Sequence, residues 1–139
     1  MRWTSLAALL VVAACLGSDF ADSVEGSWQL ESGTLADEPI VVQASHPVTM
    51  TLDEGRISGT AACNGYQGEY RIFGDHFEIR DGVAVTEMAC TPSQVMETER
   101  RFLDALLASN TIVLEEARLV LTGPGAELIF VPQEGSEGS

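Results

Sequence analysis

Short runs of alternating apolar and polar residues dominate the chain between residues 28 and 86. The clearest run is 48–53, where Val48, Met50 and Leu52 alternate with two threonines and Asp53. A period of two residues places these apolar side chains on one face, which is typical of a half-buried β-strand. Further runs predict strands at 28–30, 56–61, 67–73, 77–79 and 83–86, and 33–39 is expected to be a loop.

Turn-forming pairs separate several of these runs. Glu54-Gly55, Asn64-Gly65, Gly74-Asp75 and Asp81-Gly82 each stand between two predicted strands. Pairs that end in glycine, or that join glycine to aspartate, suit the tight connections of β-hairpins. The pattern therefore predicts a meander of short antiparallel strands.

The hydrophobic period changes after residue 91. Thr91, Pro92 and Gln94 predict the beginning of a helix, with Thr91 as N-cap, Pro92 at the first helical position and Gln94 completing a capping box. Glu99 interrupts the apolar face, and Glu97 and Glu99 are interpreted as part of a solvated face. Apolar residues follow at helical spacing, namely Val95, Met96, Phe102, Leu103, Leu106 and Leu107.

Three more strands are predicted at 112–114, 119–121 and 128–130, before a polar tail at 133–139 that is expected to be disordered. Many short antiparallel strands with one helix indicate a mainly β (α+β) fold. Closing the strands into a small barrel, with the helix inserted before the last three strands and covering one opening, would protect the strand edges.

The first residues are typical of a secretion signal. Arg2 is followed by the apolar run from Leu6 to Ala14, which is too short to span a bilayer. The run ends in Val12-Ala13-Ala14-Cys15, which resembles the lipobox of bacterial lipoproteins. We therefore expect a signal peptide at 1–14, lipid on Cys15, a tether at 15–23 and a folded domain at 24–132. An ordinary secretory signal cut nearby is the alternative.

The charge excludes one class of partner. The chain has 21 acidic residues and 7 basic ones, a formal net charge of −14. Nucleic acid binding requires a clustered basic face, so no nucleic acid partner is expected. The acidity also disfavours electrostatic docking on anionic lipid.

The cysteine count suggests a disulfide. If Cys15 is lipidated, Cys63 and Cys90 remain to pair in an oxidising compartment. Such a bond would stabilise the fold by about 3.6 kcal/mol in the chain-entropy treatment. Two buried free thiols are the alternative. A metal site is not expected, because His46 and His76 lack the spacing that would complete a ligand set.

No catalytic residue or cofactor is predicted. A nucleophile needs a histidine or an activated carboxylate within hydrogen-bond reach, and His46 and His76 are expected to lie on the surface. No glycine-rich phosphate loop precedes a helix. Polar groups do gather near the two cysteines, at Ser58, Thr60, Asn64, Tyr66, Thr86 and Glu87.

Three motifs resemble the META domain, or HslJ-like, family. They lie at 26–30, 59–66 and 86–90, and the helix at 99–106 and the closing strands also fit. Ala62 departs from the glycine that many members have before Cys63. The motif residues are assigned a structural role, with Asn64 and Gly65 forming a turn and Met88 packed inward. This set is Trp28, Gly59, Asn64, Gly65, Tyr66, Thr86 and Met88.

The resemblance implies a small lipocalin-like barrel found in secreted proteins and lipoproteins of bacteria, with links to heat shock and stress. No enzymatic activity is established for the family. We therefore expect a monomeric, non-catalytic protein of the cell envelope, attached to the membrane through lipid on Cys15, with a stress-related role or an envelope protein as partner. The alternatives are a barrel that binds a small apolar ligand and, less favoured, a protease-inhibitor-like protein or an enzyme.

Overall fold

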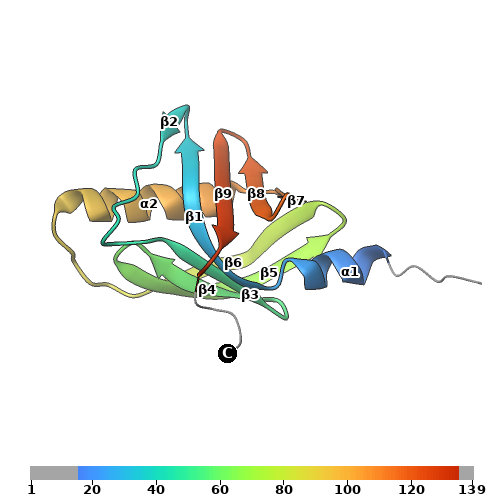
Figure 1. Cartoon of the computed structure of the whole chain (residues 1–139). Coiled ribbons are helices and arrows are strands. Elements are labelled where there is room, and N and C mark those ends of the chain that lie inside the picture. Colours follow the sequence, from blue (N-terminus) through green and yellow to red (C-terminus); the bar gives the residue numbers. More distant parts are fainter. Residues whose placement is uncertain (1–15, 135–139) are drawn as a thin grey trace, which may run out of the picture.

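An antiparallel sheet closes into a barrel in the computed structural model, which describes residues 16–134 (Figure 1). Strand β1 pairs with β3 on one side and with β9 on the other, which closes the sheet. The short strand β2 only folds back onto the end of β1. The elements are α1 (Leu16–Ser23), β1 (Gly26–Leu35), β2 (Glu38–Pro39), β3 (Thr49–Asp53), β4 (Arg56–Ala61), β5 (Asn64–Phe73), β6 (His76–Val85), α2 (Ser93–Ala108), β7 (Thr111–Glu115), β8 (Arg118–Gly123) and β9 (Ala126–Pro132).

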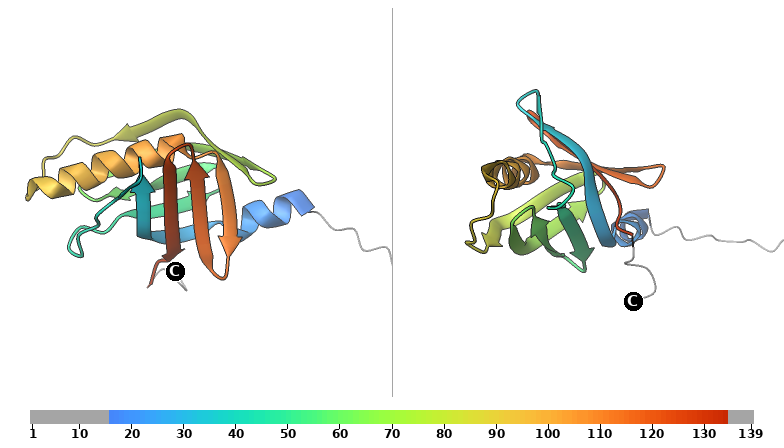
Figure 2. Two further views of the ribbon diagram at one scale, coloured as in Figure 1. Left: turned by 90° about the horizontal axis from the view of Figure 1, so that it is seen from above. Right: turned by 60° about the vertical axis from the view of Figure 1, so that its left-hand side comes forward.

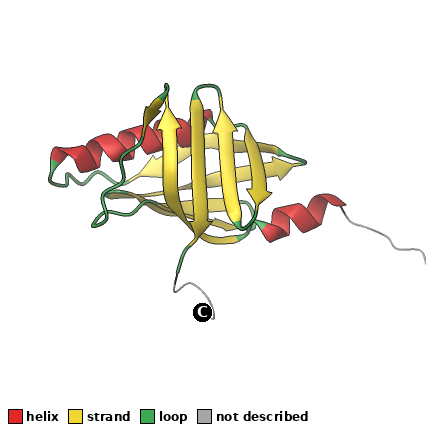
Figure 3. Ribbon diagram, turned by 45° about the horizontal axis from the view of Figure 1, so that its top comes forward, coloured by secondary structure: helices red, strands yellow, loops and turns green. Residues whose placement is uncertain are grey.

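The predicted fold class is confirmed. Consecutive strands pair antiparallel from β3 to β9, and the helix α2 stands between the sixth strand and the last three. The alternation in 48–53 is also confirmed, since Val48, Met50 and Leu52 are fully buried. Figure 3 shows the strands wrapped around a common interior. The weakest seam lies between β6 and β7, which share one residue pair, His76 with Thr111.

Helix α2 lies against one opening of the barrel (Figure 2). It touches strands from around the wall, β1, β4, β6, β8 and β9. Its inward face carries Val95, Phe102 and Leu106, all fully buried, which confirms the amphipathic pattern. The predicted capping box is wrong. The N-cap is Pro92 in an extended conformation, and a proline has no side-chain acceptor, so the helix begins at Ser93 without a side-chain cap.

The barrel interior is filled by the chain's own side chains. Phe102 projects from α2 between Phe130, with ring centroids 6.3 Å apart in an edge-on arrangement, and Tyr66, at 5.7 Å. Tilted and edge-on contacts at these distances are favoured geometries for aromatic pairs in a protein core. Phe77 and Met50 are buried in the same core.

No helix in the described part of the chain is long and apolar enough to cross a membrane.

Two of the predicted turns are wrong. The β4–β5 connection is Ala62-Cys63, because Ala61 pairs directly with Asn64 and Ala62 adopts a φ of 69°. Asn64 and Gly65 therefore belong to β5. Asp81-Gly82, with φ values of 59° and 72°, lies inside β6 and makes a bulge where the register against β5 shifts. The bulge absorbs extra residues in one strand without ending it.

Helix and strand also occur in segments where the sequence predicts neither. The segment predicted as a tether is helical from Leu16 to Ser23, and Phe20 packs half-buried against the core. The predicted loop at 33–39 contains the end of β1 and all of β2. In the predicted tail, the backbone N–H of Gln133 donates to Ser27 O at 2.9 Å. Cys15 and the signal peptide at 1–14 lie outside the described residues, as does the tail from residue 135.

Candidate functional site

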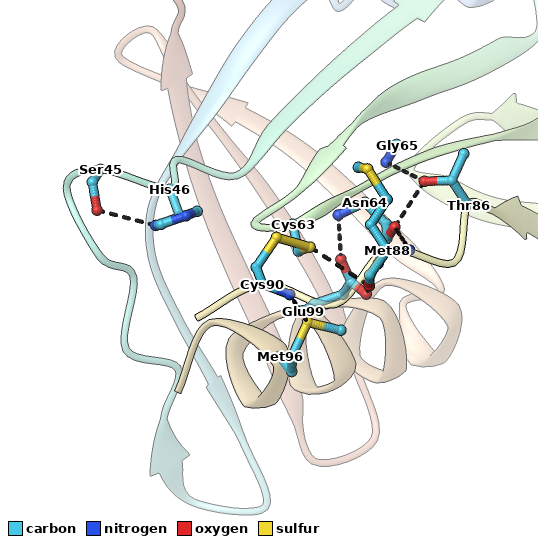
Figure 4. Close-up of a disulfide and its surroundings, with 10 residues drawn as sticks. All are labelled: Ser45, His46, Cys63, Asn64, Gly65, Thr86, Met88, Cys90, Met96 and Glu99. Carbon is cyan, nitrogen blue, oxygen red and sulfur yellow. Dashed lines mark hydrogen bonds between the residues drawn. A yellow bond between two sulfur atoms is a disulfide. The ribbon is translucent and has the colours of Figure 1, made fainter. Parts of the chain in front are cut away.

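The two cysteine motifs meet at a disulfide beside the start of α2 (Figure 4). The structure joins Cys63 to Cys90, as the cysteine count predicts, with 5.9 Å between their Cα atoms. Cys63 is buried in the β4–β5 connection, and Cys90 lies just before the helix. The bond therefore ties the edge of the barrel wall to the segment that leads into α2.

Asn64 is the centre of a hydrogen-bond network next to this disulfide. Its side chain is 2% exposed. Its Oδ1 accepts from the backbone N–H of Met88 at 2.6 Å and from the hydroxyl of Thr86 at 2.8 Å. Its Nδ2 donates to the carbonyl of Met88 at 3.0 Å. A buried amide must find such partners, and these hold the 86–88 segment against β5.

Glu99 completes the network from α2. The backbone N–H of Asn64 donates to Oε1 of Glu99 at 2.6 Å, and Asn64 Nδ2 donates to Oε2 at 2.8 Å. The residue is 7% exposed, so the interpretation of Glu99 as part of a solvated face is wrong. The sequence did contain a sign of this burial, because Glu99 stands within the apolar face of the helix. A buried carboxylate requires hydrogen-bond donors. The sequence alone could not show that Asn64 supplies them.

Tyr66 and Gly59 fix the neighbouring strands. Tyr66 donates its hydroxyl proton to the carbonyl of Thr49 at 2.7 Å, and burial raises the pKa of Tyr66 far above its usual range. A Cβ atom on Gly59 would lie 2.2 Å from that same carbonyl oxygen. The motif therefore needs glycine here because the adjacent strand passes too close for any side chain.

Met88 does not pack inward as expected. Its side chain is 56% exposed. Its backbone N–H and C=O both bond to Asn64, so the backbone and not the side chain belongs to the network. Trp28 lies apart from this site, with its indole N–H donating to the carbonyl of Val24 at 2.9 Å.

The motif residues also line a groove of about 590 Å³ across β4, β5 and β6. No residue that lines it carries a formal charge, in a chain whose net charge is −14. Its polar groups are hydroxyls and one amide. The groove residues, as this site is called below, are Ser58, Gly59, Thr60, Gly65, Tyr66, Gln67, Ala84, Val85 and Thr86.

The histidines lie away from the groove. Neither lines it; His46 bonds its sequence neighbour Ser45, and His76 lies 3.9 Å from Glu78 on the surface. Within residues 16–134, no group of three or more histidine, cysteine or acidic side chains could hold a metal ion. No histidine or carboxylate is among the described residues that line the groove.

Comparison with solved structures shows the same architecture elsewhere. A protein from Burkholderia xenovorans, solved by NMR, is similar with a TM-score of 0.68 and 21% identity, covering 96% of this chain and 99% of its own. A second NMR structure has a TM-score of 0.63 at 22% identity, over 80% of this chain and 92% of that one. A DUF4847 family protein from Bacteroides vulgatus has a TM-score of 0.55 at 14% identity, over 79% and 94%.

No curated protein matches the sequence at a significant level. The META domain matches residues 21–135, which include the disulfide, the Asn64–Glu99 network and all the groove residues. These features lie in the segments that carry the resemblance. The chain belongs to the META domain family.

Proposed function

We propose that this protein is a non-catalytic, lipid-anchored protein of the bacterial cell envelope, with a role in stress, and that it acts by binding a protein partner at the groove. The anchor is the lipid expected on Cys15. The stress role follows from the resemblance to the family. The binding role follows from the surface that the motif residues leave exposed.

The binding role is supported by a difference between residues of the same motifs: some are buried and hold the fold together, whereas others are exposed. Asn64, Glu99 and Tyr66 direct their polar atoms toward other parts of the domain. Thr60 and Gln67 instead present an exposed, uncharged surface in a strongly acidic protein. Such a surface excludes no partner by charge and can accept an extended neutral segment.

Exposed Met88 adds an apolar contact near the groove. The backbone N–H of Met88 donates to Oδ1 of Asn64, and the hydroxyl of the groove residue Thr86 donates to the same oxygen. Methionine side chains are flexible and polarisable, and they are common on surfaces that bind proteins. The groove and Met88 together would provide a polar floor and an apolar edge.

A charge placed in the groove tests this role. Thr60→Glu should abolish partner recovery when the protein is cross-linked in its native membrane and purified, because the carboxylate loses water on binding without gaining a partner. Ser32→Glu is the matched control, since Ser32 is an exposed hydroxyl residue of β1 outside the groove. Equal recovery of the same partner with both variants would overturn the assignment to the groove.

The alternatives receive less support. A barrel that binds a small apolar ligand needs interior space, whereas Phe77, Phe102 and Phe130 fill the interior here. An enzyme needs a nucleophile next to a base, and the groove contains hydroxyls without histidine. A protease-inhibitor-like role remains a special case of protein binding and would be identified by the partner recovered.

A further inference from the structure

One end of the molecule combines α1 with the tip of the β5–β6 hairpin (Figure 1). Phe73, next to that tip, is 54% exposed, and Val113 of β7 is 39% exposed. Phe20 of α1 and Val113 line the same groove of about 350 Å³, together with the turn residues Gly74 and Asp75. Phe20, Phe73 and Val113 are called the α1 patch below.

The course of the chain indicates what covers this patch. The described chain starts at Leu16, the first residue of α1, and residues 1–15 precede it. This step rests on the proposed function, in which Cys15 carries lipid directly before α1. The acyl chains then enter the bilayer beside the patch, while the disulfide and the start of α2 lie at the other end of the barrel (Figures 1 and 4).

We propose that the α1 patch rests on the lipid surface, with the ring of Phe73 at the boundary between headgroups and acyl chains. Aromatic side chains favour this depth in a membrane, and apolar contact adds to lipid anchoring. The anchor provides attachment, and the patch sets the orientation of the barrel. The disulfide end and α2 would then point away from the membrane.

The charges near the patch define the lipid. Asp75 lines the groove, and Asp22 is carried by α1. Anionic headgroups would repel these carboxylates, whereas net-neutral headgroups would not. The docking surface therefore suits zwitterionic lipid, and binding there should weaken as anionic lipid is added.

Brominated lipid provides a direct test with the full-length lipoprotein in phosphatidylcholine vesicles. Phe73→Trp places an indole in the patch, and Val41→Trp is the matched control, because Val41 is 64% exposed and lines a groove with residues of α2 instead. Brominated acyl chains should quench the added emission of Phe73→Trp several-fold more than that of Val41→Trp. Removal of the expected signal peptide removes Trp3, and the buried Trp28 then gives a common background.

The experiment distinguishes failure of the proposed lipid anchor on Cys15 from failure of the proposed contact between the α1 patch and the membrane. The mass of the purified protein reports the lipid on Cys15. A lipidated protein in which the two indoles are quenched equally would leave the anchor in place and overturn the docking. A protein without the lipid mass would overturn both. A Phe73→Trp signal that changes with protein density and not with brominated lipid would assign the patch to a second copy of the chain, again overturning the proposal.

Discussion

At the scale of single residues, the interaction between Glu99 and Asn64 explains why a carboxylate tolerates burial. Two N–H groups of one residue meet the two carboxylate oxygens of the other. Charge-assisted hydrogen bonds of this kind are stronger than neutral ones. Removing either side leaves a polar group in the interior without its partner.

Glu99→Ala should lower the free energy of unfolding by about 2–3 kcal/mol, because the buried N–H groups of Asn64 lose their acceptor. Glu97→Ala, on the exposed face of the same helix, should change it by less than about 0.5 kcal/mol. Urea unfolding under non-reducing conditions measures both. Equal changes for the two variants would show that the network does not contribute to stability.

Tyr66 should make the fold sensitive to alkali. Burial raises the pKa of Tyr66 in the folded state, so above a pH of about 10 the unfolded chain loses a proton that the folded chain retains. This contribution to stability is complete below that pH and is lost as the pH rises further. Tyr66→Phe should be less stable at neutral pH by about 1 kcal/mol, through the lost bond to Thr49, yet decline less steeply in alkali. Parallel profiles from denaturant titrations at several pH values would contradict this.

Single residues are the level at which the sequence predicts least. It identifies Asn64, Gly59 and Tyr66 as structural, but it places Asn64 in a turn and turns Met88 inward. Both errors have one cause. Hydrogen bonds between residues 24 or 35 positions apart leave no local pattern, and they decide which way a side chain points.

At the scale of elements, close approach between strands is the dominant constraint on the motif. β4 runs so near β3 that Gly59 has no room for a side chain. Gly65, in the same motif, has ordinary space, because a Cβ atom on it would lie 3.8 Å from the nearest atom, the carbonyl oxygen of Gly59. The two glycines therefore play different parts.

Gly59→Ala should destabilise the protein severely, by about 3 kcal/mol or more, because the backbone of Thr49 cannot move without breaking the sheet. Gly65→Ala should cost less than about 1 kcal/mol. Thermal unfolding followed by circular dichroism distinguishes them. A mild effect at Gly59 would mean that β3 and β4 can separate.

The disulfide acts between elements as well. Replacing both cysteines, as Cys63→Ser with Cys90→Ser, should lower the free energy of unfolding by about 3–4 kcal/mol, since the unfolded chain gains freedom. Reduction of the unaltered protein with a thiol reagent is the control and should give a similar loss. A reduced protein as stable as the oxidised one would show that the Asn64 network alone holds the segment.

Element types are largely predictable, and their ends are not. Alternation predicts β3 and the last three strands, and helical spacing predicts α2. The bulge at Asp81-Gly82 resembles a turn in the sequence because glycine with positive φ serves both purposes. Only the partner strand, which continues through Gly68 and Glu69, distinguishes them.

At the scale of the whole molecule, acidity is the dominant property. A formal net charge of −14 on one small protein produces self-repulsion in the compact state. Most ion pairs among the described residues join exposed groups, such as Arg118 with Glu31 at 3.0 Å, and pairs of that kind stabilise little. Folding therefore depends on the packed interior.

Stability should rise as sodium chloride increases from about 0.01 to 0.15 M, because screening reduces the repulsion over distances near the Debye length. The titration should use a chloride salt rather than a sulfate salt, because sulfate also strengthens hydrophobic burial and would obscure the effect of screening. Unfolding midpoints in urea at each salt concentration measure this effect. A decline over this range would indicate that specific ion pairs outweigh the repulsion.

The barrel class, the helix α2 and the family are predictable from the sequence because they depend on periodicity and on motif order. The groove is not predictable, because its lining residues come from separate parts of the sequence and meet only when β4, β5 and β6 are paired. Ser58, Thr60 and Thr86 are recognisable in the sequence as polar groups near the cysteines, but Gly65 and Ala84 carry no sign of a shared surface until the strands are aligned.

Closure of the sheet by β1 and β9 has a consequence for how the protein is made. Trp28 pairs with Pro132, so the first strand to leave the ribosome waits for the last. Contacts between such distant residues form late and slow the folding of β-proteins. A chain that crosses a membrane from its N-terminus would stay open until nearly its entire length has emerged. During that interval the edge of β1 is exposed, and delayed release of the final strand would promote aggregation.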